Sequence, residues 1–206
     1  MIVAGLTGSI ATGKSTVARI LEAAGAVVVD ADEIAHAAVR RGRPAWHQVV
    51  AHFGRQILTP DGQIDRRRLG HIIFTDPAQR KTLEHIVHPH VTARIDRRLQ
   101  EIGAGIPQAA VILDIPLLFE AGPHRPLDEI IVVYIPQALQ CKRLMARDGL
   151  SRSAAMARIR SQMSIEEKRR LATRVIDNSG DLSQTRRQAL AIYRDLRHRA
   201  GATHSG

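Results

Sequence analysis

A phosphate-binding pattern lies close to the start of the chain. Residues 8 to 15 read GSIATGKS, which places four residues between two glycines and then a lysine and a hydroxyl side chain. This is the complete G-x-x-x-x-G-K-[ST] pattern, in which backbone N–H groups and a helix N-terminus surround phosphate oxygens. We therefore expect a bound nucleoside triphosphate, with Lys14 on its β- and γ-phosphates, Ser15 on Mg²⁺ and Thr16 near the α-phosphate.

Two carboxylates are candidates for a catalytic base. In the segment VVVDADEIAH, Asp30 ends an apolar run and Asp32 begins a helical pattern. A carboxylate at this point would accept the proton of an attacking hydroxyl and align that hydroxyl with the γ-phosphate. The alternative is that Asp32 caps the helix and Asp30 bonds the phosphate loop. We favour the catalytic role for Asp32 and leave the role of Asp30 open.

A second acidic strand end lies further along the chain. Asp114 ends the apolar run AAVILD, which is typical of the element that orders the water shell of Mg²⁺. The segment PLLFE, residues 116–120, follows and offers an apolar wall together with Glu120. It fits either the protein core or a pocket for the phosphate acceptor.

A basic arm provides candidate phosphate-binding arginines. Residues 141–170 contain nine basic and three acidic side chains. Arg143 and Arg147 are four residues apart, so they share one helix face. An arginine on a transferring phosphate is worth ~10³–10⁵ in rate, far more than a surface ion pair contributes. We favour this role for Arg143 and Arg147, and we expect residues 168–170 to be an ordinary solvent-exposed helix surface.

Five apolar runs predict the strands that position these residues. They lack polar alternation, as expected for a parallel sheet with both faces covered, and helical patterns separate them. The predicted strands are Ile2–Leu6, Ala26–Val29, Ala110–Asp114, Ile130–Ile135 and Arg174–Ile176. The predicted helices between them are Lys14–Ala24, Ala138–Arg147 and Leu182–Arg199. The alternation predicts an α/β P-loop NTPase fold with a five-stranded parallel sheet flanked by helices.

Two helical excursions interrupt this pattern. About 80 residues between the second and third strands contain no convincing strand, which is far too long for an ordinary connection. Their predicted helices are Glu33–Arg40, Pro44–His52, Arg66–Phe74, Pro77–Ile86 and Val91–Ile102. We expect a nucleotide-binding core (1–31, 104–140 and 171–206), a helical acceptor domain (32–103) and a lid (141–170). The last six residues, GATHSG, are expected to be unstructured.

Composition limits the partners and the location of the protein. The formal charge of +10 implies an anionic partner, which could be nucleic acid, a membrane surface or a polyphosphorylated small molecule. Aromatic residues make up only 3%, which disfavours a stacking platform for single-stranded nucleic acid. Cys141 is the single cysteine, no apolar run reaches membrane-spanning length, and we expect no signal peptide. We expect a cytoplasmic monomer that binds neither nucleic acid nor membrane.

Other P-loop classes fit less well. The guanine-reading N-K-x-D pattern of a GTPase is absent, and the D-x-x-G at residues 177–180 follows the fifth strand, where we interpret it as a turn. A motor usually has a longer chain. His85, His88 and His90 cluster, but the lack of a nearby cysteine disfavours a metal site. A small kinase remains, with a nucleic-acid-binding P-loop protein as the alternative from another class.

The motifs together resemble one family. GLTGSIATGKST, VVDADEIAH, LEHIVHPHV, ILDIPLLFE, CKRLMARDGLS with RIRSQM, and VIDNSG occur in the order seen in dephospho-coenzyme A kinases. The resemblance extends from Met1 to about Arg199. It implies Mg²⁺-dependent transfer of the γ-phosphate of ATP to the ribose 3′-hydroxyl of dephospho-coenzyme A, the last step of coenzyme A synthesis. A kinase for another nucleotide or nucleoside acceptor is the alternative.

The resemblance also implies a role for individual positions. Asp32 resembles the catalytic base, Lys14 and Arg147 complete the catalytic set, and Ser15 and Asp114 hold Mg²⁺ through water. The expected ATP-binding residues are Gly8, Ala11, Thr12, Gly13, Lys14, Ser15, Thr16, Arg143 and Arg147. The expected acceptor-binding residues are Asp32, His88, Leu117, Leu118, Phe119 and Glu120. The loop departs from the usual family sequence GGIGSGKS at Ser9, Ala11 and Thr12, which affects only its detailed geometry.

Overall fold

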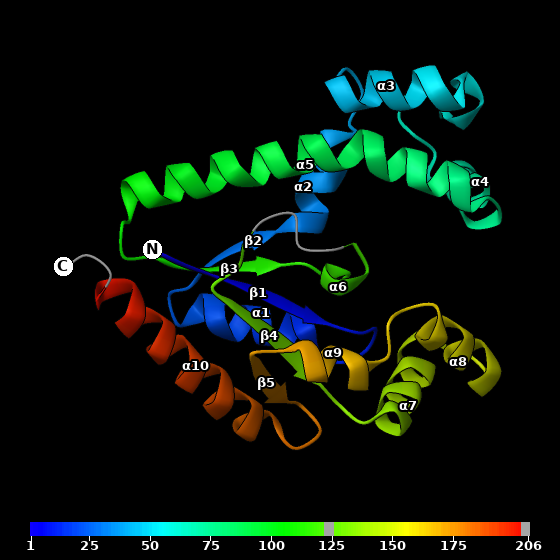
Figure 1. Cartoon of the computed structure of the whole chain (residues 1–206). Helices are drawn as coiled ribbons and strands as arrows, with labels where there is room; N and C mark the ends of the chain where they lie inside the picture. The colour runs from blue at the N-terminus through cyan, green and yellow to red at the C-terminus, as the bar shows by residue number, and fades with distance from the viewer. Residues whose placement is uncertain (122–125, 203–206) are drawn as a thin grey trace. The chain divides into compact units, whose positions relative to one another are not determined.

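The chain divides into two structural units. The computed structural model describes residues 1–121 and 126–202 (Figure 1). One unit, called the nucleotide unit below, combines Met1–Asp30 with Ile102–Gly206. The other, called the helical unit, is the continuous segment Ala31–Glu101. Each unit has its own cluster of buried apolar side chains.

The nucleotide unit is built on a five-stranded parallel sheet, as predicted. The strands are β1 (Ile2–Gly8), β2 (Val27–Asp30), β3 (Ala110–Asp114), β4 (Glu129–Tyr134) and β5 (Arg174–Asp177). Their order across the sheet is β2-β3-β1-β4-β5, and all four neighbouring pairs are parallel. Every residue of the central strand β1 is buried, which explains its lack of polar alternation.

Predicted and observed strand ends agree to within two residues, and both ends of β3 are as predicted. The largest difference is at β1, which continues beyond Leu6 to Gly8 because Thr7 and Gly8 still pair with Val132 and Val133 of β4. The two added residues carry the chain directly into the phosphate-binding pattern.

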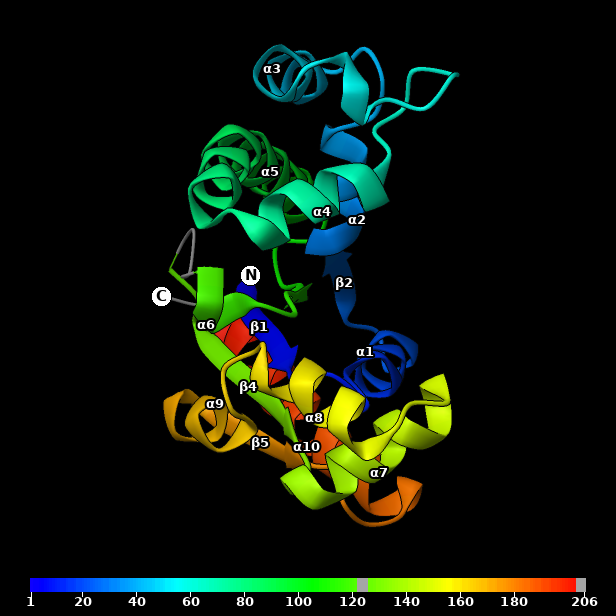
Figure 2. The same ribbon diagram turned by 90° about the vertical axis from the view of Figure 1, so that its right-hand side faces the viewer.

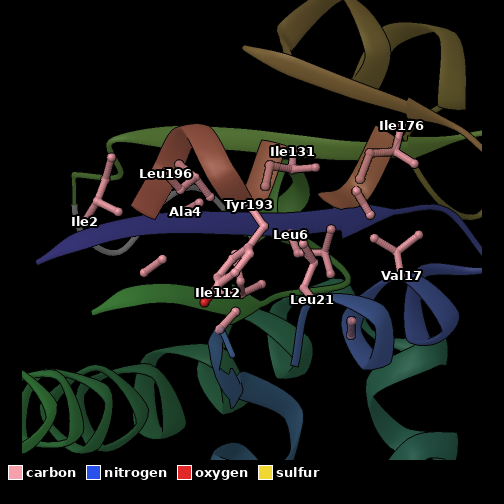
Figure 3. Close-up of a cluster of buried hydrophobic side chains, with 14 of the residues drawn as sticks. Ile2, Ala4, Leu6, Val17, Leu21, Ile112, Ile131, Ile176, Tyr193 and Leu196 are labelled. Carbon is pink, nitrogen blue, oxygen red and sulfur yellow. The ribbon is translucent and has the colours of Figure 1, made fainter. Parts of the chain in front are cut away.

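Helices cover the sheet of the nucleotide unit. They are α1 (Lys14–Ala23), α6 (Leu118–Ala121), α7 (Gln137–Asp148), α8 (Arg152–Arg160), α9 (Ile165–Leu171) and α10 (Leu182–Ala202). Side chains of α1 and α10, among them Leu21, Tyr193 and Leu196, pack with the apolar side chains of β1, β3 and β4 (Figure 3). Helix α10 includes Gly201 and Ala202, so the expectation of an unstructured tail is wrong for these two residues. Residues 203–206 lie outside the described part of the chain.

The helical unit contains α2 (Ala31–Ala38), α3 (Pro44–Phe53), a short 3₁₀ turn (Arg55–Ile57), α4 (Arg66–Thr75) and most of α5 (Pro77–Gly105). Its core joins the side chains of Val49, Phe53, Ile57 and Leu69. Partly buried residues of α5 pack against the same cluster. The helices of this segment therefore enclose an apolar centre of their own.

One prediction in the helical unit is wrong. The sequence suggested two helices on either side of Pro89, whereas α5 runs through this proline without interruption. A proline inside a helix costs about 3 kcal/mol because it removes a hydrogen bond and crowds the preceding turn. Val91, Ile95 and Leu99 follow at four-residue intervals and are buried, each worth about 1.5–3 kcal/mol. Their combined burial outweighs the cost at the exposed Pro89.

No helix within residues 1–121 and 126–202 is both long enough and apolar enough to cross a membrane.

Candidate active site

The phosphate-binding loop connects β1 to α1. The side chain of the buried Thr12 donates a hydrogen bond to the backbone oxygen of Ser9 at 2.9 Å, which closes the loop on itself. Ala11 has a φ of 62°, the left-handed conformation that costs a residue with a Cβ some free energy. The loop therefore keeps a strained backbone, a feature that clusters at ligand-binding sites.

Gly13 is required at the position where α1 begins. Its φ is 90°, and a Cβ there would lie 2.1 Å from the side-chain nitrogen of Asn178. Asn178 donates from that nitrogen to the backbone oxygen of Thr12 at 2.8 Å and accepts from the hydroxyl of Thr185 at 2.8 Å. The turn after β5 thus clamps the loop, and this close approach leaves no room for a side chain on residue 13.

A single cavity brings the predicted nucleotide-binding residues together. It has a volume of about 770 Å³ and lies along the loop at the start of α1. All nine residues expected to bind ATP line it: Gly8, Ala11, Thr12, Gly13, Lys14, Ser15, Thr16, Arg143 and Arg147. Figure 2 views the nucleotide unit from the carboxyl ends of its strands, with α7 and α8 on this side of the sheet. Loop, helix N-terminus and two arginines make this cavity suited to a polyphosphate.

Lys14 is already held by an acidic partner. Its ammonium forms an ion pair with the carboxylate of Asp114, which is buried at the end of β3. In the sheet register, Asp114 is paired with Leu6 of β1 and with Asp30 of β2. Carboxyl ends of neighbouring parallel strands meet at one edge of the sheet, which is where such folds bind ligands.

The oxygen atoms beside Lys14 suit Mg²⁺. Ser15 offers an exposed hydroxyl and Asp114 a carboxylate, and Mg²⁺ prefers oxygen ligands while keeping several of its waters. One or two protein oxygens with substrate phosphates are the usual protein contribution for this ion. Residues 1–121 and 126–202 hold no cluster of three or more His, Cys, Asp or Glu that would bind a metal, and the histidines around Pro89 form none.

The two arginines that line the cavity have different partners. Arg143 donates from its guanidinium to the backbone oxygen of Asn178 at 3.0 Å. Arg147 pairs with Asp148 at 2.7 Å, and Arg158 reaches the same carboxylate at 3.0 Å. The hydrogen bond from Arg147 lowers the pKa of Asp148 below its usual range and in turn raises the pKa of Arg147. Arg147 therefore stays charged at the cavity wall.

The segment PLLFE is divided between surface and core. Leu117 is 39% exposed, whereas Leu118 is 1% exposed and lies in the core. Phe119 packs against the buried cluster of Val132, Tyr134 and Ile165. Of the three apolar residues expected on the acceptor side, Leu117 is thus the one whose side chain faces solvent.

Glu120 has partners inside the nucleotide unit. Its carboxylate accepts from the backbone N–H of Met163 at 3.0 Å and from the ammonium of Lys168 at 3.0 Å. Lys168 also donates to the backbone oxygen of Pro116 at 3.1 Å and is completely buried. The prediction that residue 168 lies on a solvent-exposed surface is therefore wrong. A buried lysine is tolerated here because it is paired and hydrogen-bonded, and its neighbours Arg169 and Arg170 are exposed as expected.

In the helical unit, the candidate residues lie on two helices. Asp32 is the second residue of α2 and is exposed, and His88 is half-buried on α5. This unit has a cavity of about 250 Å³ lined by residues of α2 and α5 and by Arg43 and Pro44. His90, rather than His88, is among its lining residues.

Comparison with known proteins decides the family. A sequence model described as dephospho-CoA kinase matches residues 1–184. The chain belongs to the dephospho-CoA kinase family. A dephospho-CoA kinase of Carboxydothermus hydrogenoformans is 51% identical over 189 residues, which cover 91% of each chain. That of Moorella thermoacetica is 44% identical, covering 100% of this chain and 98% of the relative.

Solved structures agree with this assignment to the dephospho-CoA kinase family. The dephospho-CoA kinase of Campylobacter jejuni superposes with a TM-score of 0.72 at 34% identity, covering 95% of this chain and 97% of the other. A Thermus thermophilus crystal structure gives a TM-score of 0.78 at 38% identity over 95% and 97% of the two chains. The predicted P-loop kinase fold is confirmed.

Sequence reasoning about this dephospho-CoA kinase family member missed several residues at the cavity. Gln162 and Asn178 line it, and Gln140 bonds the loop from α7. Gln162 and Asn178 lie in the stretches RIRSQM and VIDNSG, which carry part of the family resemblance. Neither glutamine nor asparagine is diagnostic for phosphate binding. Only the family motifs that contain these two residues could have indicated that they lie at the cavity.

Proposed function

We propose that this protein transfers the γ-phosphate of ATP to the ribose 3′-hydroxyl of dephospho-coenzyme A, giving coenzyme A and ADP. This would be the last step of coenzyme A biosynthesis. The observation that carries the proposal is the family match over residues 1–184, in a chain whose phosphate-binding loop, Lys14 and two arginines line one cavity. The family match supports dephospho-coenzyme A as the acceptor, and the cavity supports ATP as the donor.

The nucleotide unit would bind the donor. Backbone N–H groups of the loop and the N-terminus of α1 would hold the β-phosphate, with Lys14 reaching the β- and γ-phosphates. Arg143 and Arg147 would neutralise the charge on the transferring group and on the departing ADP. Ser15 and Asp114 would hold Mg²⁺, which supplies charge neutralisation and orientation of the phosphate oxygens.

The helical unit would bind the acceptor and supply the base. The 3′-oxygen attacks the γ-phosphorus, the bond to the oxygen that bridges the β- and γ-phosphates breaks, and ADP leaves. The carboxylate of Asp32 takes the proton of the 3′-hydroxyl. We assign His88 and the segment 117–120, chiefly its exposed Leu117, to the acceptor side, and residues 141–170 to a lid that excludes water.

The test is ADP release from Mg-ATP with four acceptor conditions: dephospho-coenzyme A, AMP, adenosine and none. We expect strong turnover only with dephospho-coenzyme A, and a fall in kcat of ~10²–10⁴-fold in Asp32→Asn with ADP binding retained. Turnover with AMP or adenosine alone would overturn the acceptor. A fast Asp32→Asn variant would overturn the base.

The remaining partners follow from this activity. We propose that ATP and dephospho-coenzyme A are the substrates of a cytoplasmic monomer that binds neither nucleic acid nor membrane. Light scattering would give the mass of the particle for comparison with the 22.7 kDa chain. Titration with duplex and single-stranded DNA at rising salt would detect an electrostatic nucleic-acid site.

A further inference from the structure

Two glutamines hold the tip of the phosphate-binding loop. The side-chain nitrogen of Gln140 donates to the backbone oxygen of Ile10 at 2.7 Å. The backbone N–H of Ile10 donates to the side-chain oxygen of Gln162 at 2.9 Å. Both peptide groups of Ile10 are therefore fixed by side chains more than 125 positions away in the sequence.

The two glutamines lie just before and just after residues 141–160, which hold most of α7 and all of α8. Gln140 lies in α7, where the arm begins, and its side chain is completely buried. Gln162 lies in the link between α8 and α9, where the arm returns to the sheet (Figure 2). The loop tip is therefore held by one side chain just before residues 141–160 and by one just after them.

The link that carries Gln162 is itself anchored. Met163 accepts from the hydroxyl of Ser9 at 3.3 Å and donates its N–H to Glu120 at 3.0 Å. Glu120 is fixed in turn by the buried ammonium of Lys168. The side chain of Gln162 is thus presented to Ile10 by a rigid neighbour rather than by a free loop.

Apolar packing fixes the loop tip at the same place. Ile10 and Ala11 pack against a buried cluster inside the arm, formed by Cys141, Leu144, Ala155 and Ile159. Packing sets the distance between loop and arm, but it does not orient the peptide planes. The two amide hydrogen bonds supply that orientation.

The side chain of Gln140 carries a buried polar atom that packing alone would not require. Its side-chain oxygen is buried and has no hydrogen-bond partner within the part of the chain that the structure describes. An unpaired buried acceptor costs free energy, and an apolar side chain of similar size would avoid that cost. The polar contribution of this side chain therefore comes from its nitrogen, which donates to Ile10.

We propose that Gln140 and Gln162 are positioning residues for the phosphoryl donor. By holding both peptide groups of Ile10, they keep the next residue, Ala11, in its left-handed conformation and so keep the loop open for phosphate. The inference rests on the proposed nucleotide site and does not depend on the identity of the acceptor. It also couples the arm to the loop, so that the arm and the phosphates are positioned together.

The experiment compares Gln140→Met, Gln162→Met and the double variant with Gln137→Met, an exposed position at the start of α7. Methionine keeps the length of the side chain and removes the hydrogen bond. ADP affinity is measured by equilibrium titration, KM is measured for each substrate, and melting temperature reports folding. We expect each single variant to raise the Kd for ADP and the KM for ATP about 3- to 10-fold, as loss of one hydrogen bond predicts. The KM for dephospho-coenzyme A should change less than twofold, and Gln137→Met should change nothing.

The double variant provides a further readout. Because both glutamines act on Ile10, their combined effect should be smaller than the product of the single effects. The proposal is overturned if ADP affinity is unchanged, or if both KM values rise equally while the melting temperature falls. If the unmodified protein binds ADP but does not phosphorylate dephospho-coenzyme A, the proposed acceptor fails and the ADP titrations still decide this inference. Gln162, which is only half-buried, provides a usable variant if Gln140→Met fails to fold.

Discussion

The nucleotide unit and the helical unit build their candidate sites in different ways. In the nucleotide unit, Gly8, Asp114, Arg143 and Asn178 come from distant parts of the chain and meet at the carboxyl edge of one sheet. In the helical unit, all candidate residues lie within the continuous segment Ala31–Glu101, which has its own core. Strand register fixes the first site, and helix packing fixes the second. Damage to one unit should therefore leave the function of the other measurable.

The largest effect is expected at the centre of the nucleotide unit. Lys14→Met removes the cation that would contact the β- and γ-phosphates, and kcat/KM should fall by ~10³-fold or more. The KM for dephospho-coenzyme A should change little, because Lys14 is proposed to contact the donor and not the acceptor. Steady-state kinetics with each substrate varied, together with a melting curve, make this comparison. A rise confined to the KM of dephospho-coenzyme A would contradict the assignment of Lys14 to the donor phosphates.

A core substitution tests whether the helical unit fails by itself. Phe53→Ala removes a buried ring from the cluster around Val49 and should destabilise the helical unit by about 3 kcal/mol. Hydrogen exchange should then accelerate within residues 31–101, turnover should fall, and ADP affinity should stay within twofold. Phe74→Ala is the matched control, since that ring is 85% exposed. Equal loss of ADP affinity would show that the two units are not separable.

A smaller effect is expected at the buried ion pair of the nucleotide unit. Lys168→Met leaves the carboxylate of Glu120 without its cation. Because Glu120 is partly exposed, this should lower the free energy of unfolding by about 2 kcal/mol, less than for a fully buried pair. Adding Glu120→Gln removes the uncompensated charge and still offers an oxygen to the N–H of Met163, so part of the loss should be recovered. Urea unfolding measures both, with the exposed Arg170→Met as control. If the second change deepened the loss, the charge explanation would be wrong.

The smallest effect concerns pH and is again confined to the nucleotide unit. Burial pushes the pKa of Glu129 up, but hydrogen bonds from Thr173 and Arg199 outweigh it, so the pKa lies below the ordinary 4.5. A carboxyl group with a lowered pKa in the folded state contributes stability above pH 4.5 and loses it as the pH falls further. Melting temperatures of the protein and of Glu129→Gln should therefore differ at pH 7 and converge towards pH 3. A constant difference would mean that the carboxylate charge is not involved.

Lys168 and Pro89 show where reading the sequence reached its limit. Lys168 stands in a run of three basic residues, and nothing local separates it from Arg169 and Arg170. It is buried because Glu120 and the backbone of Pro116 lie beneath α9, a pairing across about 50 positions. At Pro89 a strong local signal for a helix break was overridden by the apolar residues that follow it, whose burial depends on tertiary contacts.

By itself, the sequence determined the phosphate-binding loop, the five parallel strands, most helices and the family, because these depend on local patterns and on motif order. The residues Gly8 to Ser15 form one continuous segment, so their types and spacing identify the loop without reference to tertiary contacts. Only the tertiary structure decided that Asn178 clamps the loop, that Lys168 is buried and that Gln140 and Gln162 hold Ile10. Each of these contacts joins residues far apart in the chain. The local sequence around an amide or ammonium side chain does not indicate which distant group it will contact.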